Sequence, residues 1–308
     1  MEKVIRKIGK ENQIKYKNSV GLLIYKIVIF VFLTIFSISL IFPIAWALVM
    51  AGKDVIEYTV NPFGWPTSYT FSNFSSVLEK LKVRVLTSEG IVQYGMDFML
   101  YNTLLLSIFP GILVVFFTAC MAYVLGVYKF IGSTFLHNLG IVIMILPIVG
   151  TLPSTMMVFK DLGIYDNMLL YILKAPVGCF SGMNYLILRG VFQKIPAAYR
   201  EAAEIDGAGH YTIFFKIMMP TALPTCFVFF LLTFLGGFGD YSSSLYWLPS
   251  RPTLSYGMYM FKQQAVVYEA TVPEILCGYL ILMVPNMIMY FIFHNLIISR
   301  MQVGGLKE

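Results

Sequence analysis

The densest group of ionisable side chains lies at residues 200–220, in the sequence REAAEIDGAGHYTIFFKIMMP. Glu201, Glu204 and Asp206 supply three acids there, although only 12% of the whole chain is charged. Carboxylates and bases carried on one short helix can form ion pairs with another protein. The pattern therefore favours either a contact surface for a partner or an ordinary amphipathic connector between two helices.

Motifs for catalysis and cofactor binding are absent from the sequence. It contains no G-x-x-x-x-G-K-[ST] loop, no H-E-x-x-H or G-x-S-x-G motif and no C-x-x-C pair. His137, His210 and His294 are far apart along the chain, and the four cysteines lie in apolar segments. We therefore expect no catalytic residue, no metal site and no cofactor bound by this chain, which disfavours a membrane-embedded enzyme.

The composition predicts a protein that crosses a membrane several times. Hydrophobic residues make up 58% of the 308 residues, and the mean hydropathy is +0.76. An ordinary soluble domain is about 45–50% apolar and about 25% charged. The net charge of +6 does not indicate nucleic-acid binding, because most bases flank hydrophobic runs instead of forming a patch with aromatic residues.

Hydrophobic runs of about 20 residues predict an all-α integral membrane protein with six transmembrane helices. The expected helices cover residues 27–52, 98–128, 130–159, 168–173 together with 175–188, 217–239 and 275–299. Lys174 and Pro176 interrupt the fourth helix, so we expect it to be bent. Lys174 is the one Asp, Glu, Lys or Arg among these helices, and we expect it to reach toward the membrane surface. A self-powered secondary transporter usually carries more buried charges.

The distribution of bases predicts which side of the membrane each segment faces. With six helices both termini share one side, whose segments carry 14 of the 22 Lys and Arg residues and six of the 16 acids. Bases are retained in the cytoplasm, so we expect both termini to be cytoplasmic. The expected organisation is a cytoplasmic segment 1–26, a membrane domain 27–299 with outer loops 53–97 and 240–273 and a cytoplasmic loop 189–216, and a cytoplasmic tail 300–308.

The charged segment is predicted to form two short helices separated by a glycine turn. Pro196 suits the first turn of a helix, because its missing N–H needs no partner there, and Gly207 is a natural helix stop. Ala198, Ala202 and Ile205 recur at helical spacing, which forms one narrow face over which another backbone can approach closely. The residues alone leave open whether this is a docking helix or a plain connector.

Several motifs, in order along the chain, resemble one family. The segment EAAEIDGAGHYTIFFKIMMP closely resembles the cytoplasmic E-A-A-x-x-x-G loop of ABC importer permeases, in the form typical of the maltose-type, carbohydrate-uptake branch. The stretches YNTLLLS, AYVLGVYKFIG, LPIVGTLPSTMMVFKDLGIYDN and VGGLKE resemble further motifs of that family. The resemblance thus extends over nearly the whole chain, and the loop is its most specific part.

The resemblance implies the permease subunit of a sugar importer in the bacterial inner (cytoplasmic) membrane. Such a permease forms a heterodimeric pore with a second permease, while a cytoplasmic ATPase dimer binds ATP and Mg, and an extracytoplasmic solute-binding protein delivers sugar. The loop would be the coupling helix that docks on the ATPase. The residues that match its motif are Glu201, Ala202, Ala203, Asp206 and Gly207. A permease for a non-sugar solute and a self-powered secondary transporter are the alternatives.

Four residues have the aromatic and hydrogen-bonding chemistry that sugar recognition needs. Asn184 and Tyr185 lie in the fourth expected helix, and Asp240 and Tyr241 lie at the outer end of the fifth. We expect them to line the substrate pathway, although tyrosine is common here and often lies at membrane interfaces. The sequence departs from the family in having F-G-D-Y in place of a W-N-D-F-type run, and its outer loop at 83–95 is longer than usual. Which permease of the pair holds the sugar stays open.

Overall fold

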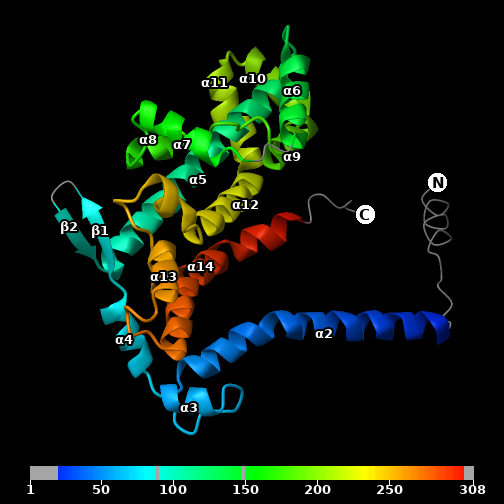
Figure 1. Ribbon diagram of the computed structural model, residues 1–308. Helices are drawn as coiled ribbons and strands as arrows, with labels where there is room; N and C mark the ends of the chain where they lie inside the picture. The colour runs from blue at the N-terminus through cyan, green and yellow to red at the C-terminus, as the bar shows by residue number, and fades with distance from the viewer. Residues whose placement is uncertain (1–19, 88–89, 147–149, 302–308) are drawn as a thin grey trace.

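The structure, a computed structural model, describes residues 20–87, 90–146 and 150–301 (Figure 1). Most of the expected cytoplasmic tail and most of the expected N-terminal segment lie outside these residues. The elements in chain order are α2 (Val20–Ala51), α3 (Val55–Val60), α4 (Ser72–Lys80), β1 (Val83–Thr87), β2 (Gly90–Tyr94), α5 (Met96–Val127), α6 (Ser133–Ile145), α7 (Leu152–Asp161), α8 (Met168–Leu173), α9 (Met183–Lys194), α10 (Ala197–Ile205), α11 (His210–Ile213), the π-helix η1 (Phe214–Met218), α12 (Met219–Phe238), the π-helix η2 (Ser243–Trp247), α13 (Leu254–Gln263) and α14 (Val272–Met301).

Four helices in the described part of the chain are long and apolar enough to cross a membrane. They are α2, α5, the continuous helix His210–Phe238 that joins α11, η1 and α12, and α14. They correspond to the first, second, fifth and sixth helices expected from the sequence. The helix α6 is apolar but shorter.

The third and fourth expected helices are not continuous in the structure. The run 130–159 is divided into α6 and α7, where Gly150 has a φ of +77° and α7 begins with a proline in its first turn. The fourth is divided into α8 and α9 by turns in which Gly178 has a φ of +84°. These glycines and the neighbouring prolines end the helices, because a left-handed residue cannot continue a right-handed helix.

The outer loop 53–97 contains a β-hairpin, so the expectation of a purely α-helical chain is wrong. Strands β1 and β2 pair antiparallel from Val83 opposite Tyr94 to Thr87 opposite Gly90. Val83 and Val85 are buried while Leu86 and Ile91 are exposed, which is the alternation that one half-buried face requires. The extra length noted in this loop is therefore folded chain. The short helix α4 precedes the hairpin and buries Val77.

Two hydrophobic clusters hold the described elements together. One is built mainly from α5, α9 and the start of the helix His210–Phe238, and includes Tyr123, Tyr185 and Phe192. The other joins α4, the hairpin, α13 and α14, and includes Val77 and Phe261. The helix α5 contributes to both clusters, so it links the end of the molecule that carries α10 to the end that carries α3 and α4 (Figure 1).

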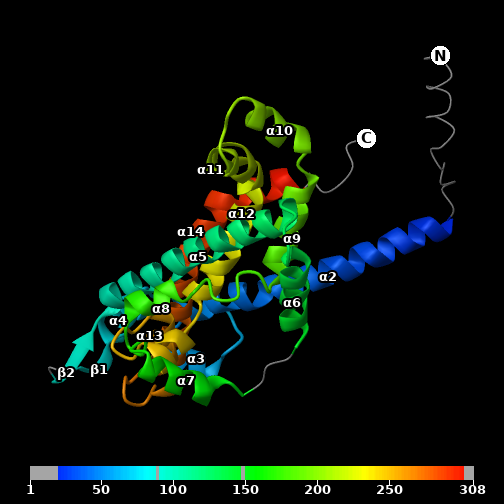
Figure 2. The ribbon, with the colours of Figure 1, turned by 90° about the horizontal axis from the view of Figure 1, so that it is seen from above.

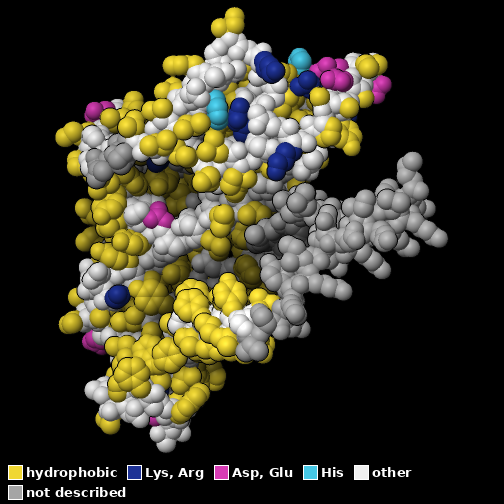
Figure 3. Space-filling view, turned by 90° about the vertical axis from the view of Figure 1, so that its right-hand side faces the viewer, with side chains coloured by type: hydrophobic (Ala, Val, Ile, Leu, Met, Phe, Trp, Pro, Cys, Tyr) yellow, Lys and Arg dark blue, Asp and Glu magenta, His cyan; other side chains and the backbone are white. Residues whose placement is uncertain are grey.

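The helix α2 projects away from the rest of the molecule in both ribbon views (Figures 1 and 2). Its most hydrophobic stretch is entirely exposed, whereas Met50 and Ala51 at its C-terminal end are buried beside α14. Figure 3 shows a side of the molecule on which charged side chains gather chiefly at the end carrying α10 and α11, above a mainly hydrophobic middle. This distribution is the one expected for a protein surrounded by lipid.

Candidate functional site

The charged segment folds as two short helices joined by a glycine turn, as its sequence predicts. The helix α10 begins after Pro196 and ends at Ile205, and Gly207 follows with a φ of +80°. The turn closes with bonds from the Gly207 N–H to the Glu204 carbonyl and from the Ala208 N–H to the Ala203 carbonyl. A side chain at Gly207 would be strained in this conformation, so the glycine sets the angle between α10 and α11.

One face of α10 is exposed and carries both small and acidic side chains. Glu201, Ala202, Glu204 and Asp206 are exposed, and Ile205 is 86% exposed. Nε of Arg200 lies 3.6 Å from Oε1 of Glu204, which is an ion pair across one turn of the helix.

Ala203 does not lie on this exposed face. It is half-buried and packs, with Ala208, against the hydrophobic cluster beneath α10. Of the two adjacent alanines that match the family motif, Ala202 is therefore the more open to a partner. Successive residues of a helix point about 100° apart, and Ala203 is the one in this stretch that points toward the cluster.

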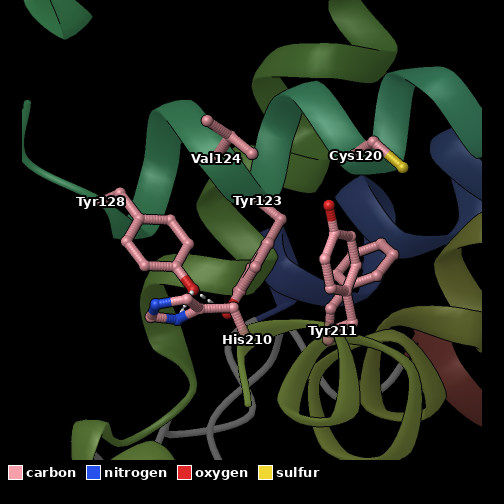
Figure 4. A pocket seen from close by; sticks show the side chains of 7 residues that line it. Cys120, Tyr123, Val124, Tyr128, His210 and Tyr211 are labelled. Atoms are coloured by element: carbon pink, nitrogen blue, oxygen red, sulfur yellow. Dashed lines mark hydrogen bonds between the residues drawn. The ribbon is translucent and has the colours of Figure 1, made fainter.

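A chain of polar contacts joins α11 to the end of α5. The Tyr128 hydroxyl lies 3.2 Å from Nδ1 of His210 and 3.1 Å from the Tyr123 hydroxyl. Figure 4 shows these side chains facing one another from the two helices, beside a cavity of about 370 Å³ whose lining also includes Tyr211 and Cys120. The contacts tie the charged segment to α5 near the helix end at Val127.

The charged segment is also continuous with a membrane-length helix. The four-residue helix α11 runs through η1 directly into α12, so residues His210–Phe238 form one helix. Within η1, Phe214 and Met218 are buried in the cluster beneath α10. A displacement of α10 and α11 would therefore be transmitted to α12 through unbroken backbone.

A second candidate site is a cavity of about 440 Å³ between α5, α8 and α12, away from α10. Its lining is Leu106, Ser107, Pro110, Tyr171, Lys174, Ala175, Thr233, Gly236, Gly237, Asp240 and Ser243. Asp240 is half-buried, and its Oδ1 and Oδ2 accept hydrogen bonds from the Ser242 and Ser243 N–H groups. The cavity combines hydroxyl, carboxylate and ammonium groups.

A smaller cavity of about 210 Å³ adjoins it, since Ala175 lines both. Asn184 and Tyr185 line this smaller cavity, together with Thr118 and the turns after α8. Tyr185, however, is 1% exposed, and its hydroxyl lies 3.1 Å from Nδ1 of His137. The structure therefore places Tyr185 chiefly in the hydrophobic cluster, where it supports the cavity wall.

The four residues proposed for a substrate pathway are thus only partly brought together. Asn184 and Asp240 line adjacent cavities, whereas Tyr241 lines neither of these two cavities. The Tyr241 ring stacks on the ring of Tyr259 in α13, with centroids 4.6 Å apart and planes inclined by 5°. Spacing along the sequence could not distinguish a tyrosine at a cavity from one in a stack.

Comparison with known proteins decides the family. Residues 118–303 match the family described as "Binding-protein-dependent transport system inner membrane component". The chain belongs to this family. It is therefore a membrane component of an ABC transport system, that is, a permease subunit, and the family gives no indication of a catalytic function.

Two curated relatives align with nearly the full length of this permease. The maltodextrin transport system permease protein MdxG of Bacillus subtilis (strain 168) is 25% identical over 295 residues, covering 94% of this chain and 99% of the relative. The galactooligosaccharides transport system permease protein GanQ of the same organism is 24% identical over 286 residues, covering 90% and 94%.

A solved structure has the same fold as the permease. The crystal structure of a bacterial ABC transporter involved in the import of the acidic polysaccharide alginate aligns with a TM-score of 0.70 and 22% identity. The alignment covers 90% of this chain and 98% of that one. The similarity shows that the two chains share their overall fold.

The sequence did not single out the contacts that position these sites in the permease. Tyr123 and Tyr128 lie in a stretch that already matched a family motif, but nothing indicated that His210 would meet them. In the described residues no group of three or more His, Cys, Asp or Glu side chains is placed to hold a metal ion.

Proposed function

We propose that this permease forms half of the translocation pore of an ATP-driven importer and takes up an oligosaccharide. The curated relatives reported above carry names that specify maltodextrin and galactooligosaccharides. The two adjoining cavities add hydroxyl, amide and carboxylate groups along α5, α8 and α12. A polar pathway through an otherwise apolar bundle fits a hydrated, polar solute better than it fits a lipid.

The observation that carries the proposal is the mechanical position of α10. The outer face of α10 is exposed, and its inner face packs on the hydrophobic cluster. The following helix α11 is joined to two membrane-length helices, to α5 through the contact between His210 and Tyr128 and to α12 through η1. We infer that α10 is a coupling helix, in which Glu201 and Asp206 make charged contacts, Ala202 permits close seating and Gly207 sets the turn. The partner would be an ATPase dimer that holds ATP and Mg.

The remaining parts of the assembly follow from the same proposal. Both chain ends and α10 face the cytoplasm, and the outer loops meet a solute-binding protein. Six membrane passages result when α6 with α7 forms the third and α8 with α9 the fourth. The exposed length of α2 would then be covered by a second permease and by lipid.

Co-purification tests this proposal directly. The tagged permease, expressed in its native cell, should bring down an ATPase and a second permease, and vesicles containing the complex should accumulate sugar only with ATP. Uptake by the permease as a single polypeptide, driven by an ion gradient, would instead identify a secondary transporter. ATP-driven uptake of a solute other than a saccharide would retain the importer and reject the sugar.

A further inference from the structure

Lys174 occupies an unusual position in the wall of the 440 Å³ cavity. It is the C-cap of α8, and its Nζ lies over three aromatic rings, 4.3 Å from the centroid of Tyr171, 4.7 Å from that of Phe159 and 5.8 Å from that of Trp247. The rings come from three segments of the chain. They therefore hold the ammonium at one place by attraction to their faces, instead of leaving it on a free side chain.

The ammonium has no anionic partner within the part of the chain that the structure describes. It forms none of the observed ion pairs and donates no observed side-chain hydrogen bond, although an ammonium has three N–H donors. The one acid that lines the same cavity is Asp240, whose carboxylate is occupied by the turn at Ser242 and Ser243. A half-buried cation of this kind is stabilised by an anion that brings its own oxygen atoms.

The rest of the cavity provides acceptors for hydroxyl groups. The Ser107 and Thr233 hydroxyls donate to the backbone carbonyls of Thr103 and Phe229, which leaves their oxygen lone pairs free to accept. Gly236 places no side chain in the cavity, and a Cβ there would meet no atom within 4 Å. The volume of about 440 Å³ lies within the range of about 300–1,000 Å³ that is usual for ligand sites.

We propose that this cavity is a subsite for an acidic sugar residue, with Lys174 binding the carboxylate of a uronic acid while Ser107 and Thr233 accept its hydroxyl groups. This inference rests on the proposed function, because it names the substrate class of the same pore. It makes Lys174 a specificity-determining residue, since a neutral sugar of equal size leaves the ammonium without its partner. Before sugar binds, the three rings hold the ammonium in place. When the sugar is bound, N–H groups of the ammonium donate hydrogen bonds to its carboxylate.

Equilibrium binding to the complete transporter tests the assignment. The permease, its partner permease and the ATPase pair are placed in lipid nanodiscs, and the affinities of trigalacturonate and of the neutral maltotriose are measured at low salt. Trigalacturonate should bind more tightly. The change Lys174→Met should weaken trigalacturonate by about 10-fold to 100-fold and maltotriose by less than about 2-fold, and Lys174→Arg should retain most of the affinity.

Lys160 is the matched control for this experiment. It also lies over an aromatic ring, 5.2 Å from the centroid of Tyr165, but it is exposed and does not line the cavity. The change Lys160→Met should leave both affinities unaltered. Higher salt should weaken trigalacturonate binding in the unaltered permease and have little effect in Lys174→Met.

The possible outcomes separate this inference from the proposed function. Equal effects of Lys174→Met on both sugars, or no binding of trigalacturonate by a complex that still imports a neutral saccharide with ATP, would overturn the subsite alone. Failure of any ATPase to co-purify would overturn the proposed importer. Preferential loss of trigalacturonate binding, with normal recovery of the Lys174→Met complex, supports both.

Discussion

Lys80 on α4 forms an ion pair with Glu274 in the first turn of α14, with Nζ 2.8 Å from Oε1. The Glu274 side chain is 6% exposed, and Ser76 and Thr271 also donate hydrogen bonds to its carboxylate. Lys80 donates a further bond to the Glu269 carbonyl. This pair therefore fastens the outer helix α4 to the last membrane-length helix, and with it the second hydrophobic cluster.

Removal of the Glu274 charge should destabilise the outer region. The change Glu274→Gln keeps the side-chain volume but leaves the Lys80 ammonium without its carboxylate, and we expect a loss of about 1–3 kcal/mol. Lys80→Met should cost less, about 1 kcal/mol, because Glu274 keeps Ser76 and Thr271 and Lys80 is partly exposed. Thermal unfolding of the purified permease in detergent measures both. The exposed Lys82→Met is the control, and an identical melting temperature in all three variants would contradict this role.

Gly207 should be intolerant of any side chain, whereas Gly209 should accept one. Gly207 has a φ of +80°, while Gly209 has a φ of −73° and open space around it. We expect Gly207→Ala to strain the turn by about 1 kcal/mol and to lower the sugar imported per ATP hydrolysed. Gly207→Pro should abolish uptake, because it also removes the N–H that bonds to the Glu204 carbonyl.

Glu201→Lys should also lower the sugar imported per ATP hydrolysed, because it reverses a charge on the exposed face of α10. Each of these variants should still insert into the membrane, which is checked by its recovery from membrane fractions. Vesicles that contain the complex then give uptake and ATP hydrolysis in parallel. Wild-type uptake in Gly207→Pro and Glu201→Lys would refute the docking role, and Gly209→Ala should behave as wild type.

The hydroxyl of Tyr128 should matter for coupling more than for stability. Tyr128→Phe removes the contacts with His210 and Tyr123 but keeps the ring, so the loss of stability should be at most about 1 kcal/mol. We expect less sugar imported per ATP hydrolysed, because α11 is then held to α5 by packing alone. Tyr211→Phe is the matched control, since Tyr211 is 84% exposed and its hydroxyl makes no hydrogen bond with the residues that the structure describes. An equal amount of sugar imported per ATP hydrolysed in the two variants would contradict this role of the Tyr128 hydroxyl.

The sequence was sufficient to predict those elements whose conformation depends on residues close together along the chain. The turn at Gly207 and the helices on either side of it follow from residue type and helical spacing. The hairpin was missed, even though Val83 and Val85 alternate with exposed residues. Five-residue strands are shorter than the hydrophobic runs that identify membrane helices, so a search for such runs does not detect them.

The candidate sites depend on contacts between distant segments, which one sequence does not specify. Lys174 was expected to reach the membrane surface, yet the ring of Trp247, far along the chain, helps to hold it beside a cavity. Likewise Tyr185 had the chemistry for sugar contact but is buried against His137. Which polar residue faces a cavity is decided by how the helices pack, and helices broken at Gly150 and Gly178 pack differently from continuous ones.

Gly236 should be the position at which the proposed pathway is most easily blocked. Its missing side chain leaves part of the 440 Å³ cavity open, so Gly236→Leu should fill that space. We expect sugar uptake to fall by about 10-fold or more, because sugar and leucine compete for one volume. Leucine favours a helix more than glycine does, so a loss of uptake with unchanged recovery reports obstruction and not unfolding. Gly21→Leu, on the exposed face of α2, is the control, and normal uptake by Gly236→Leu would place the pathway elsewhere.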